Sequence, residues 1–153
     1  MDYRICIVDP SPGYALLDSG DGDKLERYGS VIVSRPDPQA LWKKKRPELW
    51  NKAQAIFTRE GKNGGWKFRG QVPERWPIDF FGLKFWIRPT SFKHTGLFPE
   101  HGPNWLWMQE KIRARKQVSS EPVTVLNLFG YTGGATLACA DAGAEVCHVD
   151  GSK

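Results

Sequence analysis

The chain has 153 residues, a net charge of +5 and a hydrophobic content of 40 %. This length suits one domain or two small ones, and the hydrophobic residues suffice for a core. No apolar run approaches the roughly 20 residues that a membrane-spanning helix needs. Residues 1–10 carry Asp2, Arg4 and Asp9, which does not fit a signal peptide. We therefore expect a cytoplasmic protein with no membrane partner.

The cysteines and histidines do not suggest a metal site. There are three of each, and neither set has the spacing of metal ligands or of a disulfide framework. We expect Cys6, Cys139 and Cys147 to stay reduced and to be small buried apolar residues.

The positive charge is concentrated in the middle of the chain. Residues 41–118 hold seventeen Lys or Arg against six Asp or Glu, whereas both flanking segments are net acidic. All seven tryptophans lie in this basic segment. Basic side chains attract phosphates, and exposed aromatic rings can stack on unpaired bases. Nucleic acid is therefore a candidate partner, although core tryptophans and a solvated basic face would give the same composition.

Residues 1–90 have the pattern of a small, mostly β domain. Apolar and β-branched segments separated by turn residues predict two or three short strands, over residues 14–18, 24–28 and 30–34. Two helices are then predicted, over residues 39–45 and 48–58. Further along, residues 78–88 resemble a β-hairpin, with Gly82 near its centre.

A helix is predicted from Gly102 to about Lys116, with Trp105, Met108 and Ile112 on one face. Four cations crowd its last turns: Lys111, Arg113, Arg115 and Lys116. Contact with RNA would explain them, and so would the helix dipole, which favours cations at this end.

Residues 123–149 predict one βαβ unit. Residues 123–129 form an apolar run typical of a strand buried in a parallel sheet. A helix rich in small residues follows over 132–142 and ends at Gly143, before a second strand over 144–149.

The turn within this unit has features of an adenosine-cofactor site. Gly130, Gly133 and Gly134 allow backbone to approach a ligand closely, and Asp150 can accept hydrogen bonds from both hydroxyls of a ribose. The glycines do not fit the dinucleotide pattern Gly-x-Gly-x-x-Gly, and no P-loop is present. A methyl donor, a nucleotide or dinucleotide, and a purely structural turn all remain open on these residues alone.

Three segments resemble one family. Residues 125–134 (Val-Leu-Asn-Leu-Phe-Gly-Tyr-Thr-Gly-Gly), 148–153 (His-Val-Asp-Gly-Ser-Lys) and 93–101 (Lys-His-Thr-Gly-Leu-Phe-Pro-Glu-His) are similar to segments of the large-subunit ribosomal RNA cytosine-C5 methyltransferases, which depend on S-adenosylmethionine. Residues 17–20 and 35–38 resemble the β domain that precedes the catalytic domain in one bacterial branch. The resemblance implies an α/β fold: a small, mostly β domain over 1–90, followed over 91–153 by the first βαβ unit of a Rossmann-like class I methyltransferase sheet, truncated after two strands.

The resemblance also implies where S-adenosylmethionine binds. Asp150 would hold the ribose. The methionine end would lie against Asn127, Phe129, Gly130, Tyr131 and Gly133, and the cofactor would be covered by Thr95, Gly96, Leu97 and Phe98.

The segments that carry catalysis in this family, an Asp/Asn-Pro-Pro loop and a nucleophilic cysteine, come after the second strand of the sheet. The chain stops at Lys153, before either, and neither Cys139 nor Cys147 occupies such a place. We therefore expect no catalytic residue in this chain and no methyl transfer by it alone, with RNA as the substrate of the complete enzyme. A second copy of the chain is one way to cover the incomplete sheet.

One alternative is a non-catalytic module, in which the β domain and the basic helix recognise RNA or protein and the βαβ unit is a scaffold. A nicotinamide-dependent enzyme is a further alternative, disfavoured by the spacing of the glycines.

Overall fold

The structure, a computed structural model, describes residues 5–60 and 63–151. The chain divides into two compact units, each described here by itself. One unit comprises Asp9–Gly96, and the other comprises the described residues of Met1–Val8 and Leu97–Lys153.

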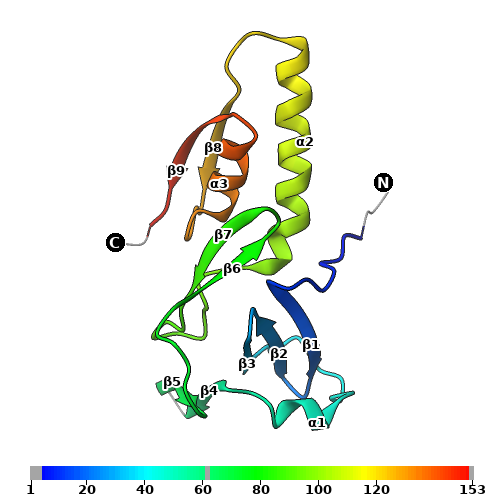
Figure 1. The fold of residues 1–153 in the computed structure, drawn as a ribbon, viewed down its shortest axis with the longest axis vertical. Coiled ribbons are helices and arrows are strands. Elements are labelled where there is room, and N and C mark those ends of the chain that lie inside the picture. The colour runs from blue at the N-terminus through cyan, green and yellow to red at the C-terminus, as the bar shows by residue number, and fades with distance from the viewer. Residues whose placement is uncertain (1–4, 61–62, 152–153) are drawn as a thin grey trace. The chain divides into compact units, whose positions relative to one another are not determined.

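The Asp9–Gly96 unit is built on a five-stranded sheet with the order β1-β2-β3-β4-β5 (Figure 1). Its strands are β1 (Tyr14–Gly20), β2 (Asp23–Tyr28), β3 (Val31–Pro36), β4 (Ala55–Glu60) and β5 (Asn63–Phe68). All neighbours are antiparallel except β3 and β4, which are parallel and connected through the short helix α1 (Pro47–Trp50). A hairpin of β6 (Trp76–Phe80) and β7 (Leu83–Ile87) completes the unit.

The predicted strands near residues 14–34 and the predicted hairpin are confirmed. The hairpin turn consists of Phe81 and Gly82, both with positive φ (50° and 77°). Two-residue turns of this backbone type match the twist of the paired strands, and glycine adopts the conformation without strain.

Of the two helices predicted between residues 39 and 58, the first is wrong and the second is correct only at its start. Residues 39–45 form a loop, α1 covers Pro47–Trp50, and residues 55–60 form β4. Ala53, Ala55 and Phe57 are buried at every second position, which is the period of a strand. Ala53 and Phe57 are also four residues apart, a spacing that fits a helix as well as a strand, so periodicity alone does not separate the two here.

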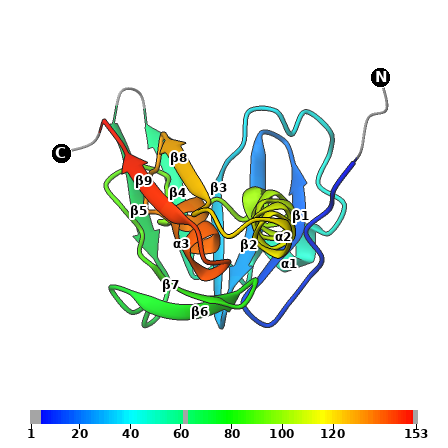
Figure 2. The ribbon, with the colours of Figure 1, turned by 90° about the horizontal axis from the view of Figure 1, so that it is seen from above.

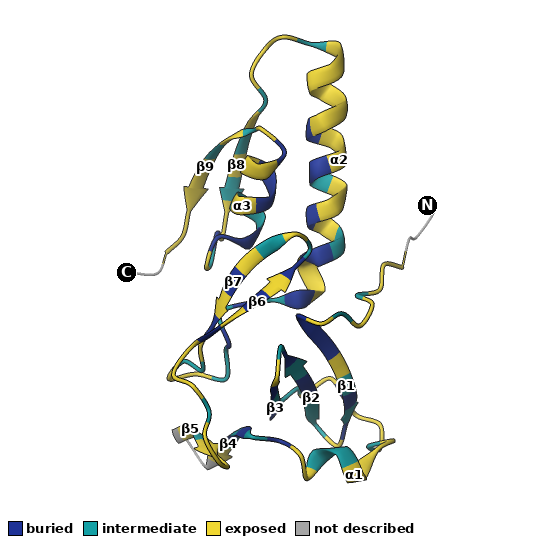
Figure 3. Ribbon diagram, viewed as in Figure 1, coloured by how far each residue is buried: buried dark blue, intermediate teal, exposed yellow. Residues whose placement is uncertain are grey.

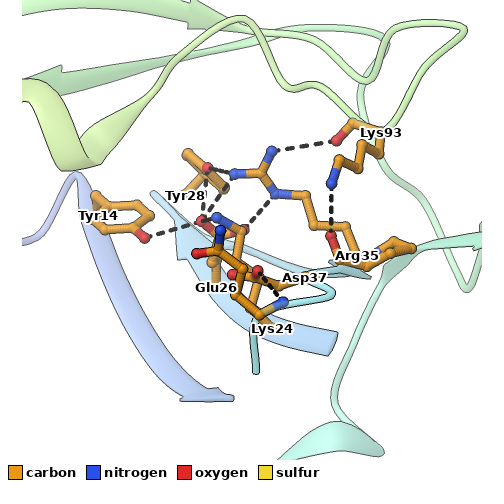
Figure 4. A network of polar contacts seen from close by, with 9 residues as sticks. Tyr14, Lys24, Glu26, Tyr28, Arg35, Asp37 and Lys93 are labelled. Carbon is orange, nitrogen blue, oxygen red and sulfur yellow. Dashed lines mark hydrogen bonds and ion pairs between the residues drawn. The ribbon is translucent and has the colours of Figure 1, made fainter. Parts of the chain in front are cut away.

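The core of the Asp9–Gly96 unit encloses a buried polar network (Figures 3 and 4). The Glu26 carboxylate accepts hydrogen bonds from the hydroxyls of Tyr14 (2.9 Å) and Tyr28 (3.1 Å) and from the Arg35 guanidinium (3.0 Å). Although burial favours the neutral acid, the hydrogen bonds and positive charge of Arg35 hold the pKa of Glu26 below its usual value. This ion pair therefore remains charged inside the core.

The same network ties residues 93–96 to the sheet. Arg35 donates to the Lys93 carbonyl (3.3 Å), and Lys93 Nζ donates to the Pro36 carbonyl (3.1 Å). The Arg88 N–H donates to the Thr95 carbonyl (3.0 Å). The unit consequently extends to Gly96, six residues beyond the end expected at residue 90.

The other unit contains the predicted α/β elements (Figure 2). They are a 3-10 turn (Pro99–His101), α2 (Gly102–Val118), β8 (Thr124–Leu128), α3 (Gly134–Asp141) and β9 (Glu145–Val149). Strands β8 and β9 pair in parallel with α3 as their connection. Ile112 of α2 packs with Cys139 and Ala142 at the end of α3, against Val125 and Val146. The opposite face of the strand pair carries the exposed residues Leu126, Leu128 and Val149.

None of the described helices has both the length and the apolarity required to cross a bilayer.

We expect Glu26→Gln to lower the free energy of unfolding by about 3–5 kcal/mol, because it leaves the Arg35 charge buried without a counter-ion. The double variant Glu26→Leu/Arg35→Met is expected to lose less than Glu26→Gln alone, since both charges are then removed. Urea denaturation measures both.

Asp79→Asn provides the control. Asp79 pairs with Lys84 at 2.8 Å, but the two side chains are 75 % and 81 % exposed. Such a pair contributes about 0–1 kcal/mol. Equal losses in Glu26→Gln and Asp79→Asn would contradict a stabilising role for the buried network.

Candidate cofactor site

The candidate site is centred on the turn between β8 and α3. Phe129, Tyr131 and Gly133 all have positive φ (62°, 51° and 92°). The Gly130 N–H donates to the Val149 carbonyl at 2.9 Å, and the Gly133 N–H donates to the Gly130 carbonyl at 2.9 Å. The first bond fixes the turn to the end of β9, and the second closes the turn itself.

Two glycines of this turn make room for rings of the protein itself. A Cβ at Gly130 would lie 2.2 Å from Cε1 of His148, and a Cβ at Gly134 would lie 2.5 Å from Cζ2 of Trp105. From the sequence, these glycines were expected to let the backbone approach a ligand. The structure shows that Gly130 and Gly134 are also needed to accommodate the protein's own rings. Gly133 has a different reason, its left-handed backbone.

A chain of polar side chains lies beside the turn. The Asn127 amide donates to the Thr136 hydroxyl (2.8 Å), which is 2.8 Å from Nδ1 of His148. Within the described part of the chain, the Asn127 side-chain oxygen accepts no hydrogen bond. It is thus an available acceptor next to the turn.

Asp150 also contacts the turn. Its Oδ2 accepts a hydrogen bond from the Tyr131 N–H at 2.6 Å. A carboxylate has two oxygens with about four acceptor positions, so one such group can accept hydrogen bonds from several donors at once. Asp150 therefore has one structural role that the sequence analysis did not foresee, besides the predicted contact with ribose.

A cavity of about 490 Å³ lies along the turn, between it and the start of α2. This volume is within the range of about 300–1,000 Å³ that small-molecule sites have. Its lining consists of Leu97, Phe98, His101, Asn104, Trp105, Met108, Asn127, Leu128, Phe129, Gly130, Tyr131, Thr132, Gly134 and Ala135.

Aromatic rings form much of the cavity wall. The rings of Phe98 and Tyr131 have centroids 4.5 Å apart and are inclined by 31°. The His101 ring lies edge-on to Phe98 at 6.2 Å. Phe129 is 92 % exposed, so its ring is accessible. The wall therefore offers flat apolar surfaces to a ligand.

Six of the residues proposed from the sequence lie together around this cavity: Leu97, Phe98, Asn127, Phe129, Gly130 and Tyr131. Gly133 and Asp150 belong to the turn and its support but are not in the lining. Thr95 and Gly96 belong to the Asp9–Gly96 unit, where Thr95 is fully buried.

The contribution of α2 and of the turn before it to the site was not predicted from the sequence. Asn104, Trp105 and Met108 line the cavity from the first turns of α2, and His101 lines it from the preceding 3-10 turn. Trp105 and Met108 lie on the helix face predicted from the sequence, but that face was given no part in the site. The spacing of three and four residues also predicts that His101 and Asn104 share this side.

The four cations of α2 differ in their surroundings. Arg113 pairs with Asp141 at 3.3 Å, and Lys116 Nζ donates to the Gly143 carbonyl at 3.1 Å, so both tie α2 to α3. Lys111 lies 3.7 Å from its neighbour Glu110. Among the residues that the structure describes, Arg115 has no side-chain partner.

One of the three cysteines is buried and two are exposed. Cys139 is buried, which raises the pKa of its thiol, and its Sγ lies 3.8 Å from the Met108 sulfur. The expectation that all three cysteines are buried is wrong for Cys6 and for Cys147 on β9, which are both exposed.

The chain is similar to known methyltransferases. The solved structure of a SAM-dependent methyltransferase from Agrobacterium tumefaciens matches 92 % of the chain and 44 % of its own length, with 45 % identity and a TM-score of 0.82. Ribosomal RNA large subunit methyltransferase K/L from Magnetococcus marinus is 41 % identical over 63 residues, which are 41 % of this chain. The protein of the same name from Chromohalobacter salexigens is 28 % identical over 123 residues, or 80 % of this chain. No protein-family model matches.

The resemblance to S-adenosylmethionine-dependent methyltransferases is confirmed. The chain spans 8 % and 14 % of the lengths of these two curated relatives.

Gly134→Ala is expected to destabilise the chain by about 1–3 kcal/mol, the usual cost of overpacking a well-filled core. The reason is the contact with the buried Trp105 ring. Gly151→Ala is the control, because its Cβ would meet no atom within 4 Å. Thermal unfolding of both variants tests this, and equal stabilities would show that the Trp105 ring moves aside without cost.

Proposed function

We propose that the chain binds S-adenosylmethionine in the cavity beside residues 129–133 and forms the cofactor-binding part of a methyltransferase that acts on ribosomal RNA. The observation that carries the proposal is this cavity, in a chain 45 % identical to a SAM-dependent methyltransferase. In this proposal, β8, α3 and β9 are the first βαβ unit of a Rossmann-like class I sheet.

The aromatic wall suits the adenine and sulfonium groups. Phe98 and Tyr131 offer flat faces on which a base can stack, and the accessible ring of Phe129 adds a third. Aromatic faces also attract cations such as a sulfonium. When bound, the cofactor supplies an electrophilic methyl group.

The polar end of the cavity suits the amino-acid part of the cofactor. The first N–H groups of α3 have no acceptor within the helix, and they favour a carboxylate. The Asn127 side-chain oxygen is available to an ammonium group. Asp150, at the end of β9, would accept hydrogen bonds from the ribose while it holds the Tyr131 N–H.

The relatives' names support ribosomal RNA as the substrate of the complete enzyme. Cytosine as the target base is supported by the resemblance of residues 125–134 and 148–153 alone. Cys139 is buried and its thiol pKa is raised, which supports our expectation that residues 1–153 alone transfer no methyl group. The exposed face of β8 and β9, with Leu126 and Val149, is the surface that a second copy would cover.

The second candidate function is a non-catalytic module that binds RNA through the exposed side of α2. Arg115, whose side chain makes no hydrogen bond or ion pair in the described part of the chain, favours it most. Arg113 and Lys116 favour it less, because both already bind the end of α3. The two functions are compatible, and only the first requires the cavity.

Calorimetric titration with S-adenosylhomocysteine tests the proposed function. We expect saturable binding by the wild-type chain and a loss of about ten- to 150-fold in affinity for Asp150→Asn, because hydrogen bonds to charged groups contribute about 1.5–3 kcal/mol. The asparagine oxygen can still accept from the Tyr131 N–H, so this bond to the turn is kept.

Asp150→Ala is the companion variant, which removes the bond to Tyr131 as well. A loss in Asp150→Ala with none in Asp150→Asn would mean that Asp150 acts only by supporting the turn. Absence of any binding to folded wild-type chain would refute the cofactor site as proposed.

A further inference from the structure

The loop between β3 and α1 carries the strongest local concentration of positive charge. Residues 41–46 read Leu-Trp-Lys-Lys-Lys-Arg, and we call them the basic loop. It lies wholly within the Asp9–Gly96 unit and overlaps the segment 39–45, for which a helix was predicted. The proposed cofactor site uses none of its residues.

The backbone of the basic loop is fixed to the turn between β1 and β2. The Asp21 N–H donates to the Trp42 carbonyl (2.7 Å), and the Gly22 N–H donates to the Ala40 carbonyl (2.9 Å). Gly20 lies so close that a Cβ there would be 2.5 Å from the Lys44 nitrogen. A glycine is therefore required for the loop to sit where it does.

A buried carboxylate holds the other half of the loop. Asp18 accepts hydrogen bonds from the Arg46 N–H (2.9 Å), the Lys45 N–H (3.3 Å) and the Trp50 indole (2.8 Å). Burial favours the neutral acid, but these hydrogen bonds outweigh it and lower the pKa of Asp18. The loop is consequently held by an ionised group at neutral pH.

Two of the four cations of the loop have acidic partners, and the other two have none among the described residues. Lys43 binds Asp21 (3.1 Å), and Lys44 binds Asp23 (3.3 Å) and lies 3.8 Å above the Trp50 ring. Lys45 and Arg46 are exposed, and in the described part of the chain neither side chain has a partner. The charges of Lys45 and Arg46 are therefore uncompensated and can attract an anion. Because their backbone is already fixed, the entropic cost of ordering the loop on binding is low.

An exposed tryptophan lies next to these charges. Trp42 is 54 % exposed, although its indole N–H donates to the Ser19 carbonyl at 2.8 Å. The neighbouring Leu41 is 86 % exposed. The hydrogen bond orients the Trp42 ring and leaves much of its surface open, as a stacking platform requires.

We propose that the basic loop is a contact site for single-stranded RNA, in which Lys45 and Arg46 bind backbone phosphates and a base stacks on Trp42. Uncompensated cations beside an exposed aromatic ring are the combination that binds unpaired nucleic acid. The choice of RNA over an acidic protein rests on the proposed function, whose substrate is RNA. The loop would then hold the substrate outside the cofactor cavity.

The salt dependence of RNA binding tests the phosphate contacts. A fluorescently labelled 12-nucleotide polyuridine is titrated with the wild-type chain and with Lys45→Gln/Arg46→Gln at several salt concentrations. Each phosphate contact on a single strand contributes about 0.7 to the slope of log K against log salt. We expect the double variant to lower the magnitude of the slope by about 1.4.

Lys84→Gln/Arg88→Gln is the matched control, with the same loss of charge from exposed cations on the hairpin. It should leave the slope within 0.3 of the wild-type value, roughly half of one phosphate contact. Trp42→Ala should weaken binding about five- to 150-fold without changing the slope, since stacking of one base contributes about 1–3 kcal/mol.

Equal slopes for Lys45→Gln/Arg46→Gln and the control would overturn the proposal. It would also be overturned if the wild-type chain bound polyglutamate and no polyuridine, because the loop would then recognise acidic protein. The loop variants should bind S-adenosylhomocysteine as the wild type does. Failure of the cofactor titration in every variant, with RNA binding kept, would refute the proposed function and not the contact site.

Discussion

The candidate site depends on how closely β9 and α2 approach the turn after β8. His148 and Trp105 occupy the positions that side chains at residues 130 and 134 would take. Glycine at both positions allows the turn to lie between the two rings, and the cavity opens beside it. The spacing of the glycines is thus imposed first by packing within the chain. Any contact between backbone and ligand follows from a turn that this packing has already fixed.

The Asp9–Gly96 unit uses ionised groups in two opposite ways. Glu26 and Arg35 neutralise each other inside the core, where an unpaired charge would be costly. Asp18 instead binds backbone N–H groups, so that the charges of Lys45 and Arg46 remain available outside. The excess of positive charge in the middle of the sequence therefore does not have one common structural role. Part of it is compensated within the fold, and part is presented to solvent.

The fold was predicted correctly where the spacing of the apolar residues and the glycine or proline residues that end an element indicate the same structure. The apolar run that begins at residue 123 and the glycine at position 143 predicted β8, α3 and β9. Six of the site residues proposed from the sequence line one cavity. The prediction failed over residues 39–45, which form a loop, and beyond α1 up to residue 58, where apolar residues four apart fit a strand as well as a helix. It also did not find the basic loop, because the loop conformation depends on hydrogen bonds from Asp18 and the β1–β2 turn, far away in sequence.

Phe129 and Tyr131 keep left-handed backbone conformations although neither is glycine, at a cost of about 1–2 kcal/mol each. Both rings belong to the cavity wall. Selecting variants of this chain for heat resistance would consequently favour glycine at these two positions, and the same changes would remove the wall. The turn is therefore a place where thermostability and ligand affinity oppose each other, and increased heat resistance there would not indicate an improved protein.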